Sequence, residues 1–157
     1  MPGEPGGSPK RRALALDVGE RRIGLAVGDT ETMLAVPAGH IQRARTGADF
    51  IAVLKTARDR EADVIVVGMP LTVRGEMGPQ ALAVGTFVNG LRAHTDMPVV
   101  EWDERYTTVE AEHRMRVTRP EGSRGRGLSW RPAKGDVDAA AAAVLLQSWL
   151  DAQQEVA

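Results

Sequence analysis

Apolar residues near the start of the chain fall into three short runs that polar turns separate. The runs cover Arg12–Leu16, Arg22–Val27 and Met33–Gln42, and each has the length of a β-strand. Asp and Gly residues in the gaps between them are typical of tight turns. Because the runs lie so close together in the sequence, we predict an antiparallel meander of three strands.

After this meander the pattern alternates between helices and strands. Apolar residues recur at helical spacing in Asp49–Ala62, whereas Val64–Val67 is the continuous apolar run of a strand buried on both faces. A loop rich in Gly and Pro, Gly68–Pro79, leads to a helix over Gln80–His94. The segment Pro98–Glu104 then predicts another strand, which ends on acidic residues.

Two further helices are expected on either side of an irregular segment near the C-terminus. Thr107 and Glu110 form a capping box that begins one helix, and Asp136–Gln153 is a helical stretch rich in Ala and Leu. The segment 119–134 between them has no hydrophobic period. The element order is therefore β-β-β-α-β-α-β-α-α. It predicts an α/β fold with a mixed five-stranded sheet and helices on both faces.

Length and composition suit one domain, which we place at 11–153. The chain has 157 residues, of which 43% are hydrophobic and 26% charged, as in an ordinary globular protein. It contains no Cys, which excludes disulfides and thiolate metal ligands. Residues 1–10 predict a flexible tail rather than a signal peptide, and no apolar run reaches the roughly 20 residues of a membrane helix. We therefore expect a cytoplasmic protein without a membrane partner.

The net charge of −1 gives no general reason to expect nucleic-acid binding, so that expectation depends on local clusters. The segment 114–134 is such a cluster, because it has seven basic residues and only Glu121 as an acid. Its glycines predict a flexible basic loop at 119–134, and Trp130 could stack on a base. A solvated loop without a partner is the alternative. We favour phosphate contacts from four residues of this loop: Arg124, Arg126, Arg131 and Lys134.

Carboxylates end two of the predicted strands and begin the last helix. Asp17 ends the first strand, Asp103 and Glu104 end the last strand, and Asp138 lies just inside the final helix. Taken singly, each fits a hairpin turn, a solvated strand end or a helix cap. Together they can meet at one edge of the sheet, where their repulsion calls for a cation. Oxygen ligands without His or Cys favour Mg²⁺ or Mn²⁺, which can promote phosphodiester hydrolysis.

Four motifs, taken in order over about 12–151, resemble the YqgF/RuvX family. They are Asp17-Val18-Gly19-x-x-Arg22-Ile23-Gly24-x-Ala26, Gly68-Met69-Pro70-Leu71 with Gly75, Asp103-Glu104-Arg105-x-Thr107-Thr108-x-x-Ala111 and Lys134-x-x-x-Asp138-x-x-Ala141-Ala142-x-x-Leu145-Leu146-Gln147. The resemblance implies an RNase H-like fold similar to that of RuvC and a nuclease that uses Mg²⁺ or Mn²⁺. It also implies one of two substrates, the 5′ end of precursor 16S ribosomal RNA or a Holliday junction.

The resemblance also implies which acids are catalytic. By match to the motifs they are Asp17, Asp138 and either Asp103 or Glu104. Strand alternation lets only one of the last two face Asp17, and the residues do not choose between them. We favour Asp103 as the third metal ligand and expect Glu104 to contact the ligands rather than the metal itself.

Basic residues outside the loop are expected to bind backbone phosphates of the substrate. They are Arg22 after the first turn, Arg74 in the Gly/Pro-rich loop and Arg105 after the last strand. The family commonly has a Lys-rich loop before its last acid, whereas this chain has Arg and Gly with Trp130. That difference keeps the charge and changes how a substrate would be held.

Two other classes of function stay open. One is a non-catalytic RNA-binding factor for ribosome assembly, which would keep the acids for structural reasons. The other is an actin-like ATPase, whose first phosphate loop also has Asp-x-Gly between two strands. Such ATPases clamp a nucleotide between two domains, and 157 residues supply only one. The assembling ribosome is an expected partner of the nuclease, and cutting a junction symmetrically would call for a homodimer.

Overall fold

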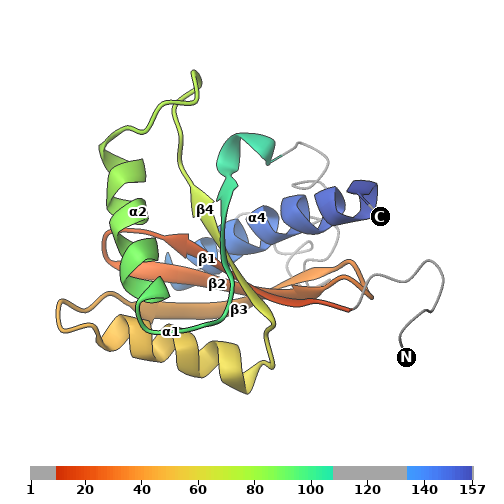
Figure 1. Cartoon of the computed structure of the whole chain (residues 1–157), viewed down its shortest axis with the longest axis horizontal. Helices are drawn as coiled ribbons and strands as arrows, with labels where there is room; N and C mark the ends of the chain where they lie inside the picture. Colours follow the sequence, from red (N-terminus) through yellow and green to blue (C-terminus); the bar gives the residue numbers. More distant parts are fainter. Residues whose placement is uncertain (1–9, 108–133, 157) are drawn as a thin grey trace, which may run out of the picture.

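The computed structural model describes residues 10–107 and 134–156. They build one sheet with the strand order β3-β2-β1-β4-β5, and helices cover both of its faces (Figure 1). The strands are β1 (Arg12–Val18), β2 (Arg22–Asp29), β3 (Ala35–Gln42), β4 (Val64–Met69) and β5 (Val99–Asp103). The helices are α1 (Ala48–Asp59), α2 (Pro79–Arg92) and α4 (Lys134–Val156), with a 3-10 turn, η1 (Glu104–Tyr106), after β5.

The sheet is mixed, because β1 pairs antiparallel with β2 and parallel with β4. In addition, β2 pairs antiparallel with β3, and β4 pairs parallel with β5. The predicted meander and the predicted five-stranded mixed sheet are therefore confirmed. In this topology the ends of β1, β4 and β5 lie at one edge of the sheet, which we call the carboxyl edge.

Some element ends differ from the predictions for reasons of backbone geometry. The third strand begins at Ala35 rather than Met33, because Met33 has a φ of 59° and its amide closes the turn after β2 on the Asp29 carbonyl. Helix α2 begins with Pro79, at a position where a missing N–H costs nothing. Most of the predicted tail, of the helix expected after Thr107 and of the basic loop lies outside the described residues. No described helix has the length and apolar character needed to cross a membrane.

Alternation along the strands builds two hydrophobic cores, one on each face of the sheet. In β1, Leu14 and Leu16 face the core that α1 and α2 cover, whereas Ala13 and Ala15 face the core that α4 covers. The first core is rich in large aliphatic side chains, and the strands bring mostly Ala and Val to the second. We call these two sides of the sheet the α1/α2 face and the α4 face.

The N-terminal end of α4 lies directly against β2. A Cβ on Gly24 of β2 would lie only 2.0 Å from the carbonyl oxygen of Asp138. Further along the helix the buried Gln147 side chain donates to the Met33 carbonyl at 2.9 Å and accepts from the Ala35 amide at 3.1 Å. The backbone contact at Gly24 and the hydrogen bonds of the Gln147 side chain fix α4 on the sheet, and with it the backbone position of Asp138.

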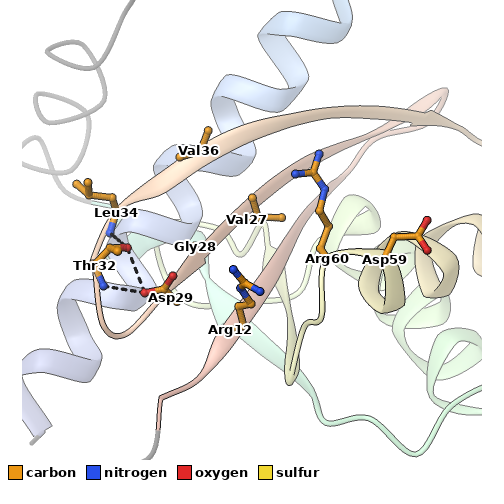
Figure 2. A pocket seen from close by; sticks show the side chains of 9 residues that line it. All are labelled: Arg12, Val27, Gly28, Asp29, Thr32, Leu34, Val36, Asp59 and Arg60. Atoms are coloured by element: carbon orange, nitrogen blue, oxygen red, sulfur yellow. Dashed lines mark hydrogen bonds between the residues drawn. The ribbon is translucent and has the colours of Figure 1, made fainter.

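A hollow of about 440 Å³ lies at the other end of β1 (Figure 2). Residues of β1, β2 and the turn after it line this hollow, together with Asp59 and Arg60 at the end of α1. Asp29 there accepts hydrogen bonds from the amide and hydroxyl of Thr32, as Figure 2 shows. None of the predicted site residues lines this hollow. The candidate site is therefore at the carboxyl edge.

Candidate active site

Asp17 and Asp138 lie near each other at the carboxyl edge, on the α4 face. Asp17 is the last residue but one of β1 and follows Ala13 and Ala15 in the alternation toward α4. Its register partner in β2 is Gly24, the residue whose backbone contacts Asp138. Burial raises the pKa of Asp17 above its ordinary value, and the charge of Asp138 raises it further. The two carboxylates therefore repel each other.

Glu104 approaches the same place from the end of β5. It is the first residue of η1, and a Cβ on Gly68 would lie 2.7 Å from its Oε1. Because Gly68 has no side chain, the Glu104 carboxylate can lie over the end of β4. Burial raises the pKa of Glu104, and the charges of Asp17 and Asp103 add to this effect. Three acids from β1, η1 and α4 thus gather at the carboxyl edge.

Asp103 is directed to the opposite side of the sheet. Val100 and Trp102 of β5 pack against the core on the α4 face, whereas Val99 belongs to the core on the α1/α2 face. Alternation therefore turns Asp103 away from α4 and Glu104 toward it. We favoured Asp103 as the acid on the side of Asp17. In the structure Glu104 is the one near Asp17, and Asp103 lies on the other face.

Arg105 neutralises Asp103 on that opposite side. Its Nη2 and Nε atoms donate to Asp103 Oδ2 at 2.6 and 2.9 Å, and its backbone amide donates to Asp103 Oδ1 at 2.9 Å. These hydrogen bonds hold the pKa of Asp103 below its ordinary value. We predicted Arg105 as a phosphate ligand, and in the structure its guanidinium is engaged by Asp103.

A hydrogen-bond chain anchors the end of β5 on α4. The Trp102 indole donates to the Ser148 hydroxyl at 3.2 Å, and that hydroxyl donates to the Tyr106 carbonyl at 2.8 Å. Ser148 is buried, so its polar group depends on these partners. The chain fixes the backbone on both sides of Glu104. One signal in the sequence could have identified Ser148. With Gln147 it interrupts the apolar residues from Leu145 to Leu150 of a helix expected to pack on the sheet, and a polar side chain there needs internal partners.

Arg22 is bound inside the candidate site. Its Nε donates to Asp138 Oδ2 at 2.7 Å, and both side chains are about three-quarters buried, with exposed fractions of 25% and 28%. We predicted that Arg22 binds a phosphate of the substrate. In the structure it is instead the partner of Asp138, so a phosphate contact would require this ion pair to open.

The remaining predicted phosphate ligands are only partly covered by the structure. Arg74 is exposed in the loop between β4 and α2, at the same edge as the acids. The side chains of Arg124, Arg126, Arg131 and Lys134 lie outside the described residues. Arg74 therefore keeps the exposure that a phosphate ligand needs.

The three acids have the oxygen ligands that a divalent metal ion prefers, but in this structure their side chains are not arranged around one position. Three carboxylates offer the oxygen ligands that Mg²⁺ and Mn²⁺ prefer, and the raised pKa values of Asp17 and Glu104 reflect negative charge that a cation would relieve. Within the described ranges, however, no group of three or more His, Cys, Asp or Glu side chains is assembled as a metal site. Arg22 occupies one oxygen of Asp138 in this arrangement.

Two glycines position the acids, and sequence analysis gave them no role of their own. Gly24 lets α4 lie against β2, and Gly68 leaves room for the Glu104 carboxylate. Both stand inside strands, where Gly lowers β-propensity and often marks a close approach of another group. That general rule, applied to the predicted strand Arg22–Val27, could have identified Gly24. It could not have identified Gly68, which is predicted to begin a loop and which the structure places inside β4.

Two Holliday junction resolvases are among the solved structures that share this arrangement of strands and helices. RuvC of Thermus thermophilus in complex with a Holliday junction substrate superposes with a TM-score of 0.57 at 15% identity, over 92% of this chain and 96% of that chain. The resolvase of fowlpox virus superposes with a TM-score of 0.52 at 12% identity, over 90% and 99%. Identities this low carry the fold alone. The fold is RNase H-like, as the sequence predicted.

Sequence relatives define the family. The RuvX family model, described as a Holliday junction resolvase, matches residues 11–152. A candidate pre-16S rRNA nuclease of Roseiflexus sp. is 41% identical over 156 residues, which is 98% of this chain and 100% of that protein. A relative of the same name in Anaeromyxobacter dehalogenans is 42% identical over 140 residues, 89% and 96% of the two chains. The chain belongs to the RuvX family. This confirms the prediction of a nuclease that acts on nucleic acid.

Proposed function

We propose that this chain hydrolyses phosphodiester bonds in structured nucleic acid with Mg²⁺ or Mn²⁺ held by Asp17, Glu104 and Asp138. The observation that carries this proposal is the gathering of three carboxylates from distant parts of the chain at one edge of the sheet. Such a gathering is costly for folding, since burial and mutual repulsion raise the pKa values of Asp17 and Glu104. A catalytic role explains why the chain keeps it.

The described residues at the carboxyl edge have different proposed roles. Asp17, Glu104 and Asp138 would hold the divalent cation, which would supply an activated water and charge neutralisation for phosphodiester hydrolysis. Asp17 is held by a buried strand, Asp138 by the close contact of α4 with β2, and Glu104 by the anchored end of β5. These constraints fix the backbone positions from which the three side chains extend. We assign phosphate binding to the exposed Arg74 and to the basic residues Arg124, Arg126, Arg131 and Lys134. Asp103 and Arg105 hold the end of β5 together through their hydrogen bonds.

The substrate that we propose is the 5′ end of precursor 16S ribosomal RNA, cut in the cytoplasm on the assembling ribosome. Relatives that match this chain over nearly their full length are candidate pre-16S rRNA nucleases, which supports this choice. A Holliday junction is the second candidate, favoured by the description of the family and by the fold of RuvC. Junction resolution would need a homodimer with two sites, whereas trimming of one RNA end would not.

The experiment compares purified wild type with Asp17→Asn in Mg²⁺, Mn²⁺ or EDTA on two labelled substrates, a precursor rRNA end and a four-way DNA junction. We expect metal-dependent cutting by wild type and a loss of about three orders of magnitude in the variant, because the substitution removes one of the carboxylates that would hold the cation. Substrate binding should be retained, since Asn preserves the shape of the side chain. Metal-dependent cleavage by Asp17→Asn would overturn the proposal.

A further inference from the structure

Arg22 has an unusual place among the basic residues of the described chain. It begins β2, and the alternation that points Ile23 into the α1/α2 core points Arg22 toward α4. Its Nε bonds to Asp138, which is 116 positions away in the sequence. Among the described residues, no other basic side chain is paired with Asp17, Glu104 or Asp138 in a salt bridge. Arg22 is therefore the basic residue that the described chain places on an acid of the candidate site.

The ion pair limits what Asp138 can bind. The 2.7 Å hydrogen bond uses Oδ2 of Asp138, so this oxygen is not free for a metal ion while the pair is closed. The backbone of α4 at Asp138 lies directly against β2. A Cβ at Gly24 would lie 2.0 Å from the Asp138 carbonyl oxygen, so the helix has no room to move closer to the strand. A change of partner must therefore come from rotation of the Asp138 or Arg22 side chain.

We infer that Arg22 is a positioning residue that serves as the internal counter-cation of the acid site and competes with the divalent cation for Asp138. Without metal, Arg22 holds Asp138 and offsets part of the negative charge at the carboxyl edge. When a divalent cation enters, Asp138 exchanges Arg22 for the metal, which brings a double positive charge to the same carboxylates. This inference rests on the proposed function, because it takes the acids to be metal ligands.

Competition and a purely structural role for Arg22 predict opposite changes in metal affinity when Arg22 is removed. If Arg22 only held Asp138 in position, removing it would weaken metal binding. If Arg22 competes, Arg22→Gln leaves the carboxylates with uncompensated charge, so metal-free protein is less stable and metal binding is tighter. By linkage, the stabilisation that a given concentration of metal confers then increases. Arg22→Lys keeps a charge but loses the fixed geometry of the guanidinium, so it should lie between the two.

The test measures Mn²⁺ affinity by calorimetry and the melting temperature with and without Mn²⁺. The proteins are wild type, Arg22→Gln, Arg22→Lys and the neighbouring exposed Arg21→Gln as a matched control. We expect Mn²⁺ affinity about fivefold or more higher in Arg22→Gln, a lower metal-free melting temperature and a larger Mn²⁺-induced rise. Arg22→Lys should show a smaller change of the same sign, and Arg21→Gln should match wild type.

The outcomes separate this inference from the proposed function. Equal or weaker Mn²⁺ affinity in folded Arg22→Gln and Arg22→Lys, with binding intact in wild type, would overturn the competition and leave the nuclease proposal standing. Failure of wild type to bind Mn²⁺ at all would overturn both. Asp17→Asn serves as the reference for lost metal binding, since it removes a proposed ligand without touching the Arg22–Asp138 pair.

Discussion

The two faces of the sheet are packed in opposite ways. On the α1/α2 face, Leu14, Leu16 and Phe87 belong to a core of large side chains that keep the helices at an ordinary distance. On the α4 face the strands present Ala13, Ala15 and Gly24, so the helix backbone comes close to the strands. All three acids of the candidate site lie on this second face.

The closer packing on the α4 face holds the residues of the candidate site more rigidly than packing through large side chains would. A helix held by large side chains can shift as those side chains change rotamer, whereas a helix in backbone contact with a strand has little freedom. Residues at the end of such a helix are placed by the backbone itself, as a catalytic constellation requires. The α1/α2 face therefore contains most of the large core side chains, whereas the close packing on the α4 face fixes the positions of the acids.

The largest effect that would test this contrast is expected from Gly24→Ala. Its Cβ would meet the backbone of Asp138, which cannot yield unless α4 moves, so we expect a loss of about 3 kcal/mol in the free energy of unfolding. Gly85→Ala is the matched control in α2, where the nearest atom is Met77 Cε at 3.7 Å; a helical Gly→Ala change there should stabilise by about 0.5–1 kcal/mol. Urea denaturation measures both. Equal stability of the two variants would contradict the tight backbone contact.

A smaller change in stability and a clear change in activity are expected from Gly68→Ala. Its Cβ would meet the flexible end of Glu104 and the Leu145 side chain, both of which can give way. The free energy of unfolding should therefore fall by only about 1 kcal/mol. Displacing the carboxylate should reduce cleavage by about tenfold to a hundredfold, since misplacement by a fraction of an ångström is costly in catalysis. Unchanged kcat in this variant would show that the position of Glu104 does not matter.

The smallest expected effect is the dependence of stability on pH. The folded pKa values of Asp17 and Glu104 lie above their ordinary values, so the fold favours their neutral forms. Their stabilising contribution is present below the ordinary carboxyl range, about pH 4, and is lost as pH rises through the raised values. In EDTA, Asp17→Asn should therefore be more stable than wild type at pH 7, by a margin that shrinks toward pH 4. A variant that is less stable at pH 7 would contradict the repulsion.

Much of the fold could be predicted from the sequence, because its signals are local. Burial explains the continuous apolar run of β4 and the periodic apolar positions of α1 and α4. Burial of one face makes apolar residues recur at every second position of a strand and at every third to fourth position of a helix, and this period is visible in the sequence. The start of β3 was placed two residues early, because the positive φ of Met33 leaves no mark in the apolar pattern.

The candidate site could be predicted only in part. Asp17 and Asp138 were identified because a strand end and a helix start are visible in the sequence. The choice between Asp103 and Glu104 depends on the register of β5 beside β4, in which Trp102 lies next to Gly68, and register is a long-range property. The pairing of Arg22 with Asp138 joins residues 116 positions apart and was missed for the same reason.

The measurement that tests the central claim most directly compares Glu104→Gln with Asp103→Asn in a metal-dependent cleavage assay on the precursor rRNA end and the four-way junction. The two acids are neighbours in the sequence and lie on opposite faces of the sheet, so each variant is the control for the other. We expect Glu104→Gln to lose cleavage by about two orders of magnitude or more and Asp103→Asn to stay within about tenfold of wild type. The reverse result would contradict a catalytic site on the α4 face.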